Sequence, residues 1–232
     1  MRRILLKLSG EALANGGDSI YDTAFVDKVA AALKACKDEG YEIAVVVGAG
    51  NIWRGRQGSD MDRTAADRMG MLATVINSIC LKDALVRAGV KSSVMSAVPM
   101  APLAENYSAD AAVAKLEAGE IVVFGAGLGI PFLSTDTAGA VRASEISADA
   151  MLMAKNVDYI YTDDPRKNPD AKKLEHVKAS EVLAMNLKAI DATATAFCLS
   201  NAMPIHVFGL KEPEDIIRAV KGEAVGTVIS AE

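Results

Sequence analysis

Short runs of apolar residues alternate with segments of helical periodicity from the start of the chain. Residues 4–8 form an apolar run that is typical of a buried strand. Phe25, Val29, Leu33 and Cys36 then recur at steps of four, four and three, which places them on one helix face. The same reading predicts further strands at 41–47, 90–98, 121–124, 150–153, 159–161, 204–208 and 227–230. It predicts further helices at 63–88, 107–118, 136–146, 181–185, 191–201 and 213–220.

The longest predicted helix spans 63–88, and Gly89 ends it. Its large apolar residues are expected on the buried side; they are Met69, Leu72, Ile76, Ile79 and Leu85.

Alternating strands and helices predict an α/β fold, a three-layer αβα sandwich around a mainly parallel central sheet. We expect a single domain over residues 1–232, with lobes at approximately 1–150 and 151–232 that share one core. Ligands of such sheets bind at the carboxyl ends of strands. The loops after Leu8, Val47, Phe124 and Tyr161 are therefore the candidate functional loops.

Composition narrows the choice of functions. Apolar residues make up 51% of the chain, and its formal net charge is −5 with scattered charges, so there is no dense basic face for nucleic acid. No apolar stretch approaches the roughly 18 residues that span a bilayer. The three cysteines (Cys36, Cys80 and Cys198) are odd in number and form no CxxC, which favours free thiols and a soluble, cytoplasmic protein. With no HxxxH, Cys/His cluster or GxSxG motif, zinc and serine-hydrolase chemistry are disfavoured.

Two of the candidate loops offer groups that bind anions. Lys7 ends a buried strand and is followed by Ser9 and Gly10, so its ammonium must either meet an anion or reach solvent along the strand end. The loop 48–55 carries three glycines with Arg54 beside the last of them, which suits close approach of a phosphate. It is not a dinucleotide fingerprint, because Trp53 stands where the third glycine belongs.

Two further segments could bind a nucleotide. The loop 125–133 is glycine-rich and ends in Ser134, Thr135 and Asp136 before a helical pattern. One of these three would suffice as an ordinary helix cap, whereas three suggest an anion at the helix start. Asp67 is a candidate acceptor for a ribose hydroxyl, and Tyr161 could stack on a base, although either could equally be an ordinary surface residue.

Together these segments resemble the amino acid kinase superfamily, and within it most closely the bacterial UMP kinases. The matching segments are 7–13, 50–55, 67–74, 131–136, 164–165 and 204–208, in the family's order and across the whole chain. The run Met-Gly-Met-Leu-Ala-Thr at 69–74 is particular to UMP kinases, whereas the lysine loop is shared across the superfamily.

The resemblance implies the amino acid kinase-like fold and transfer of the γ-phosphate of ATP to UMP, giving UDP and ADP for UTP and CTP synthesis. Residues 1–150 would form the acceptor-nucleotide lobe and 151–232 the ATP lobe. The catalytic residues would be Lys7, Arg54 and Asp136, with Asp136 orienting Lys7 and the phosphates. ATP would bind to Lys7, Leu8, Ser9, Gly10, Gly50, Arg54, Lys155, Asn156, Tyr161 and Asp164. UMP would bind to Ala49, Asp67, Leu128, Gly129, Ile130, Pro131, Phe132, Leu133, Ser134 and Thr135.

The resemblance also implies Mg²⁺ held through the ATP phosphates without a protein metal site, a homohexamer, and UTP as an inhibitor. The chain departs from the family pattern at three places. Ala49 replaces a glycine and requires a negative φ, Lys155 stands where Thr or Asn is common, and the loop 14–20 lacks the segment linked to activation by GTP.

Two other functions stay open at this stage. A kinase of the same superfamily could act on carbamate or on a carboxylate, although Asp67 and the Ser-Thr-Asp loop favour a nucleotide acceptor. A non-catalytic nucleotide- or oxyanion-storage protein could keep the same fold, but it would not need Lys7, Arg54 and Asp136 together.

Overall fold

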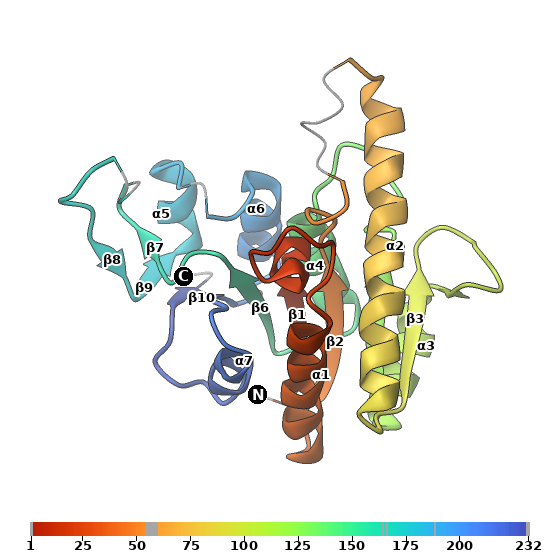
Figure 1. Ribbon diagram of the computed structural model, residues 1–232. Coiled ribbons are helices and arrows are strands. Elements are labelled where there is room, and N and C mark those ends of the chain that lie inside the picture. Colours follow the sequence, from red (N-terminus) through yellow and green to blue (C-terminus); the bar gives the residue numbers. More distant parts are fainter. Residues whose placement is uncertain (1, 54–59, 164, 166, 188, 231–232) are drawn as a thin grey trace.

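A nine-stranded sheet runs through the described part of the computed structural model, residues 2–53, 60–163, 165, 167–187 and 189–230 (Figure 1). Every neighbouring pair in this sheet is parallel except the β10–β11 pair. In spatial order the strands are β4 (Glu105–Asn106), β3 (Ser92–Ser96), β5 (Ile121–Gly125), β2 (Glu42–Val47), β1 (Arg3–Leu8), β6 (Ala150–Lys155), β10 (Ile205–Gly209), β11 (Thr227–Ser230) and β9 (His176–Lys178).

Helices cover both faces of the sheet. One face packs against α1 (Thr23–Asp38), α2 (Arg63–Arg87) and α7 (Glu214–Val220). The other packs against α3 (Ala109–Glu117), α4 (Thr135–Glu145), α5 (Ala179–Ala184) and α6 (Ala192–Ser200). A short 3₁₀ helix, η1 (Gly10–Ala14), follows β1. The predicted α/β sandwich with a mainly parallel sheet is confirmed, and the division into two lobes stays a prediction.

The central strands are buried on both faces because helices lie on each side of them. Alternate residues of β1 therefore enter different cores: Leu6 and Leu8 pack toward α1, whereas Leu5 packs on the side of α4. Lys7 shares the face of Leu5, two residues away, so strand geometry directs its side chain toward α4. This alternation places the lysine of the first candidate loop beside the start of that helix.

The expected burial of α2 is largely wrong. Leu85 is fully buried, but Met69 and Ile79 are each 39% exposed, Ile76 is 51% exposed and Leu72 is 55% exposed. The face that packs on the sheet carries mainly small residues and a few medium-sized ones; its buried members are Ala66, Ala73, Thr74, Val75, Asn77, Ser78, Leu81, Ala84 and Leu85. A helix that is apolar on several sides has no distinct periodicity from which to choose its buried face.

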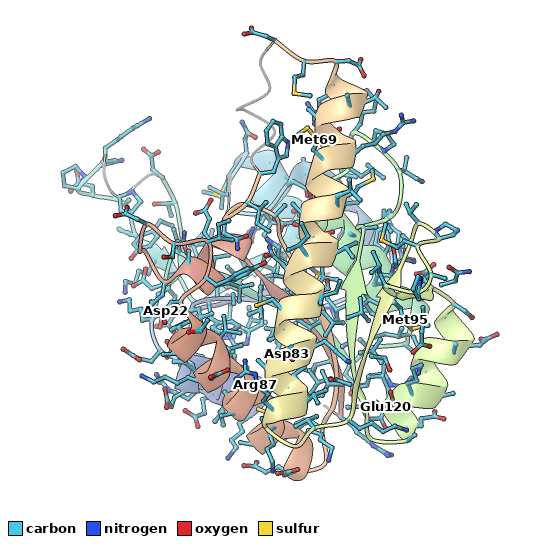
Figure 2. The ribbon with its side chains drawn as sticks, turned by 45° about the vertical axis from the view of Figure 1, so that its right-hand side comes forward. Asp22, Met69, Asp83, Arg87, Met95 and Glu120 are labelled. Atoms are coloured by element: carbon cyan, nitrogen blue, oxygen red, sulfur yellow. The ribbon has the colours of Figure 1, made fainter. Side chains whose placement is uncertain are left out.

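The expectation that no stretch approaches a membrane span is wrong by length and composition, because helix α2 has 25 residues and a mean hydropathy of 1.4 in its best window. It packs along β3 and β5 in the described structure, as the core helix of a layered domain does. Figure 2 shows its whole length, with Met69 toward one end and Asp83 and Arg87 toward the other.

The predicted strand at 159–161 does not belong to the central sheet. Residues Ile160–Tyr161 form β7, which pairs with β8 (Lys173–Leu174) in a separate two-stranded sheet. The strand that pairs with β1 on the side away from β2 is β6, which ends at Lys155. Strand pairing brings together segments far apart in sequence, so a short apolar run alone does not reveal its sheet.

Candidate functional site

Four adjacent parallel strands, in the order β5, β2, β1 and β6, end at the edge of the sheet where the predicted loops lie. Three of the predicted loops, those after Leu8, Val47 and Phe124, therefore meet at this edge. The fourth loop there follows Lys155 rather than Tyr161.

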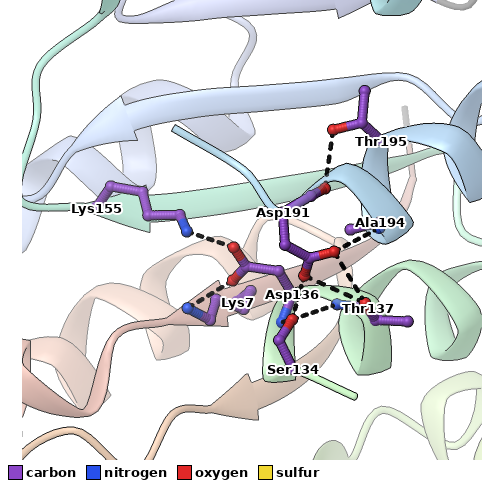
Figure 3. A network of polar contacts seen from close by, with 8 residues as sticks. All are labelled: Lys7, Ser134, Asp136, Thr137, Lys155, Asp191, Ala194 and Thr195. Carbon is purple, nitrogen blue, oxygen red and sulfur yellow. Dashed lines mark hydrogen bonds and ion pairs between the residues drawn. The ribbon is translucent and has the colours of Figure 1, made fainter. Parts of the chain in front are cut away.

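A buried carboxylate between two lysines lies at the centre of this edge (Figure 3). Lys7 Nζ lies 2.8 Å from Asp136 Oδ1, and Lys155 Nζ lies 2.6 Å from Asp136 Oδ2. Lys7 is 6% exposed and Asp136 is 7% exposed, so the ammonium of Lys7 does not extend into solvent. The three side chains together carry a formal net charge of +1 in a largely buried space.

The pKa values of this cluster follow from burial and mutual charge. Burial alone would raise the pKa of the Asp136 carboxyl, but the ammonium groups of Lys7 and Lys155 outweigh it and hold the pKa below its usual value. Burial, and next the charge of Lys7, lower the pKa of Lys155 below that of an ordinary lysine, against the opposing effect of Asp136. The cluster is therefore suited to gaining an anion, which would relieve the repulsion between its two ammonium groups.

The N-terminus of α4 positions Asp136. Ser134 caps this helix, and its hydroxyl accepts hydrogen bonds from the backbone N–H groups of Asp136 (3.0 Å) and Thr137 (3.1 Å). The ordinary role of a helix cap thus falls to Ser134, while Asp136 contacts the lysines and Thr135 lines a cavity. The sequence pattern alone did not separate these three positions, whereas the family resemblance gave Asp136 the role of orienting Lys7 and Ser134 and Thr135 that of binding UMP.

Sequence reasoning missed Asp191, which joins the two halves of the site. Its carboxylate caps α6 by accepting from Ala194 N–H at 2.8 Å, and it also accepts from the hydroxyls of Thr137 (3.1 Å) and Ser134. The N-termini of α4 and α6 therefore meet at one carboxylate (Figure 3). In the sequence Asp191 looks like any helix cap, so local pattern gives no sign of this second role.

The two glycine loops after β1 and β2 touch each other. A Cβ on Gly10 would lie 2.4 Å from Gly48 O and 2.6 Å from Asn51 Oδ1, so only glycine fits there. Asn156, directly after β6, donates a hydrogen bond to Glu11 in η1 at 3.1 Å. Positive φ occurs at six non-glycine residues of the described chain, and Ala49 is not one of them. The alanine that replaces a family glycine therefore causes no backbone strain.

Most of the predicted acceptor residues surround one cavity of about 210 Å³ between α2 and the loop before α4. Its lining includes Ala49, Asp67, Leu128, Ile130, Leu133, Ser134 and Thr135 from the predicted set. Gly129, Pro131 and Phe132 lie in the same loop. The sequence missed seven lining residues, namely Trp53, Ala66, Gly70, Met71, Thr74, Ala126 and Gly127.

Asp67 connects α2 with that loop. Its carboxylate accepts a hydrogen bond from Phe132 N–H at 2.8 Å and contacts Arg63 Nε at 2.9 Å. The side chain thus lies at the cavity wall with only 18% of its surface exposed. A sugar hydroxyl entering the cavity would meet a carboxylate that the loop already holds in place.

Two larger cavities lie near this edge of the sheet, and one of them is lined by members of the central cluster. One, of about 500 Å³, is lined by Gly50, Asn156, Leu210 and the loop 14–20. The other, of about 390 Å³, is lined by Asp136, Lys155 and the segments around α5 and α6.

The remaining predicted ATP residues differ in their placement. Leu8 is fully buried, so it could offer only its backbone, and Ser9 follows it directly before η1. Tyr161 lies in the small β7–β8 sheet, and its hydroxyl donates to Asp158 Oδ1 at 2.9 Å. It lines none of the three cavities described above. Arg54 and Asp164 lie outside the described residues.

The site gathers charged side chains and N–H groups that are suited to a phosphate. Among the residues that the structure describes, no three His, Cys, Asp or Glu side chains are grouped to hold a metal ion. Lys7, Lys155 and the N-terminus of α4 supply positive charge and N–H groups at one place, which are the usual partners of phosphates. The fold and the site are suited to a protein that binds phosphorylated ligands at the carboxyl edge of an α/β sheet.

Comparison with known proteins gives the family. Residues 2–209 match the amino acid kinase family, and the chain belongs to that family. The structure is similar to the crystal structures of the UMP kinases from Bacillus anthracis (36% identity, TM-score 0.95, covering 100% of this chain and 96% of that one) and Ureaplasma parvum (36%, 0.93, 99% and 98%). It is also similar to the uridylate kinase from Archaeoglobus fulgidus (27%, 0.77, 99% and 100%). The resemblance inferred from the sequence motifs is confirmed.

Proposed function

We propose that this chain is a UMP kinase, which transfers the γ-phosphate of ATP to UMP and yields UDP and ADP. The observation that carries the proposal is the buried Lys7–Asp136–Lys155 cluster with its net positive charge, beside the cavity that contains Asp67 and Thr135. Full-length similarity to two bacterial UMP kinases at 36% identity supports UMP as the acceptor.

The reaction needs alignment and charge neutralisation more than proton transfer. The phosphate of UMP is already anionic near neutral pH, so it can attack the γ-phosphorus without a general base. The ammonium groups of Lys7 and Lys155 would face the charge on the transferring group, and Asp136 would hold both of them in place before the nucleotides bind. Mg²⁺ bound to the ATP phosphates would supply further charge neutralisation when present.

The acceptor would occupy the cavity of about 210 Å³ and the donor one of the two larger cavities. Ala49, Asp67 and the loop 128–135 would contact UMP, with Asp67 accepting a hydrogen bond from the ribose. Lys7, Leu8, Ser9, Gly10, Gly50, Lys155 and Asn156 would contact ATP. Arg54, Tyr161 and Asp164 stay predictions from the family resemblance.

An acceptor screen tests this proposal. Release of ADP from ATP is followed by a coupled assay with UMP, CMP and dUMP, and with carbamate as the acceptor of related kinases. We expect UMP to be the fastest acceptor. We expect a lower rate with dUMP, because it lacks the 2′-hydroxyl that could donate to Asp67. Absence of ADP with every nucleoside monophosphate would favour a storage protein, and turnover with carbamate alone would favour another kinase of the family.

Self-association follows the same line of inference. The family resemblance implies a homohexamer, and the exposed apolar side chains of α2 (Met69, Leu72, Ile76, Ile79 and Val86) suit an interface between copies of this chain. Light scattering after size-exclusion chromatography should show an oligomer for the wild type and a smaller species for Leu72→Glu with Ile76→Glu. A monomeric wild type would contradict this assembly.

We also propose that the protein lies in the cytoplasm and acts in pyrimidine nucleotide synthesis. The three cysteines are free, and Cys36 and Cys198 are buried, which suits a reducing compartment. Inhibition by UTP is proposed from the family. The loop 14–20 that borders the cavity of about 500 Å³ lacks the family's GTP-linked segment, so activation by GTP is left out of the proposal.

A further inference from the structure

A buried amide in α2 lies behind the phosphate-facing loops. Asn77 has 0% of its surface exposed, and it interrupts the apolar run between Val75 and Ile79. A polar side chain in such a place must be hydrogen-bonded, because an unpaired buried amide is costly. Its partners therefore indicate why the helix carries it.

Every hydrogen-bonding position of the Asn77 amide is used. Its Nδ2 donates to Gly48 O at 2.7 Å and to Asn51 Oδ1 at 2.8 Å. Its Oδ1 accepts from Tyr21 Oη at 2.7 Å and from Asn51 Nδ2 at 3.1 Å. The orientation of the amide is fixed, because Gly48 O can only accept and a flipped amide would place oxygen against oxygen.

These contacts control the loop after β2. In the described chain the only cis peptide bond is Ala101–Pro102, so the Gly48–Ala49 peptide is trans. In a trans peptide the carbonyl and the N–H point in opposite directions. By holding Gly48 O, Asn77 turns the N–H of Ala49 away from itself, and Ala49 lines the acceptor cavity.

The same contacts reach the loop after β1. Gly10 packs against Gly48 O and Asn51 Oδ1, the two atoms that accept from Asn77 Nδ2. Gly48 N–H in turn donates to Leu8 O at 2.9 Å. Asn77 thus stands behind both of the glycine loops that face the phosphates.

We infer that Asn77 is a positioning residue for phosphoryl transfer, acting through Gly48 and Asn51 to aim the backbone of the two glycine loops. This inference rests on the proposed function. Tyr21 is its one titratable neighbour among the hydrogen-bond partners described, and burial raises the pKa of Tyr21 to about 12, so its hydroxyl remains a donor at working pH.

The decisive variant is Asn77→Asp, which keeps the shape of the side chain and both accepted hydrogen bonds. It loses both donated bonds when ionised, and its carboxylate then faces Gly48 O. We expect kcat/KM for UMP to fall on the order of a hundredfold at about pH 8, the effect of misplacing groups that contact a substrate. Wild-type kcat/KM in this variant would overturn the inference.

A pH profile separates positioning from general damage to the fold. Burial raises the pKa of a carboxyl group, and the protonated form of the introduced group regains one donor for Gly48 O. The ratio of the variant's kcat to that of the wild type should therefore rise about tenfold between roughly pH 8 and pH 5.5, with circular dichroism confirming the folded state. A flat ratio would overturn the inference.

Ser78→Ala is the matched control. Ser78 is the next residue of α2 and is equally buried. Its hydroxyl donates to Thr74 O at 2.8 Å and lies 3.4 Å from Phe124 O, so its partners lie outside the two loops after β1 and β2. We expect its kinetics to stay within about twofold of the wild type, since it loses only one ordinary hydrogen bond. Equal losses of activity in Ser78→Ala and Asn77→Asp would mean that Asn77 is merely structural.

A second variant decides the matter if Asn77→Asp does not fold. Tyr21→Phe removes one bond to Asn77 Oδ1 without touching the loops, and we expect it to lower kcat/KM for UMP severalfold. Unchanged kinetics in a folded Tyr21→Phe would overturn the inference. Binding of UMP, followed through the fluorescence of the sole tryptophan, Trp53 in the acceptor cavity, gives a readout besides turnover. An inactive wild type in the same assay would instead refute the proposed function.

Discussion

Replacing Lys7 by Ala tests the central cluster, because the structure separates its effect on rate from its effect on stability. Lys7 Nζ lies 2.8 Å from Asp136, and Lys155 Nζ lies 2.6 Å from the other carboxylate oxygen. Without Lys7 the carboxylate therefore keeps a partner. The loss of about 3–5 kcal/mol that follows when a buried charge is orphaned is thus not expected.

The remaining cost to stability comes from the aliphatic part of the side chain. Three methylene groups beyond Cβ, buried at about 0.8 kcal/mol each, give roughly 2.4 kcal/mol. A domain with about 5–15 kcal/mol of stability stays folded after such a loss. Lys7→Met keeps most of this buried volume without the charge, so it should melt closer to the wild type than Lys7→Ala does.

The effect on rate should be much larger. Removal of Lys7 lowers the formal charge of the cluster from +1 to zero at the place where the transferring phosphate would lie. Loss of one preorganised donor costs about 3–4 kcal/mol in the transition state, on the order of a hundred- to a thousandfold in kcat. Coupled ADP release at saturating ATP and UMP measures this loss in both variants.

The two variants of Lys7 separate the loss of its charge from the loss of its packing. Lys7→Ala and Lys7→Met should lose kcat to the same degree while differing in melting temperature. Turnover near that of the wild type in either folded variant would remove Lys7 from the reaction. A loss of kcat in Lys7→Ala that Lys7→Met restores would show that packing, not charge, is what the site needs.

Three further changes test other parts of the site. Gly10→Ala places a Cβ 2.4 Å from Gly48 O, so it should abolish most activity, whereas Gly17→Ala, with only a 3.4 Å contact, should not; parallel kinetic assays compare them. Burial lowers the pKa of Lys155, so its ammonium is lost at a lower pH than that of an ordinary lysine. We therefore expect kcat/KM for ATP to decline with rising pH as this ammonium is lost. The pH profile of Lys155→Arg, whose guanidinium does not titrate, should lack this decline. Asp67→Ala should raise KM for UMP about ten- to a hundredfold, the value of a hydrogen bond to a charged group, with KM for ATP unchanged; an equal rise in both would contradict a role for Asp67 at the acceptor alone.

The amino-acid sequence was enough to predict the fold class and seven residues that line the cavity between α2 and the loop before α4. Short β-branched runs between helical patterns dictate a parallel sheet, and the carboxyl ends of parallel strands must share an edge. Lys7, the glycines after β2 and the Ser-Thr-Asp segment could therefore be assigned to one site before any contact was known. Lys7 and the glycines after β2 stand at the end of, or directly after, a strong strand signal, and the Ser-Thr-Asp segment ends the loop that follows the strand at 121–124.

Which groups meet across that edge depends on contacts between segments that are distant in the sequence. In the tertiary structure Asp136 pairs with Lys155 as well as with Lys7, Asp191 contacts the start of α4, and Tyr161 lies in a separate sheet. Met69 and Leu72 are also turned outward, because the sheet accepts the small residues of α2 more closely than its large ones. Periodicity is a local property, whereas the partner of a buried charge and the buried face of an apolar helix depend on packing between segments distant in the chain.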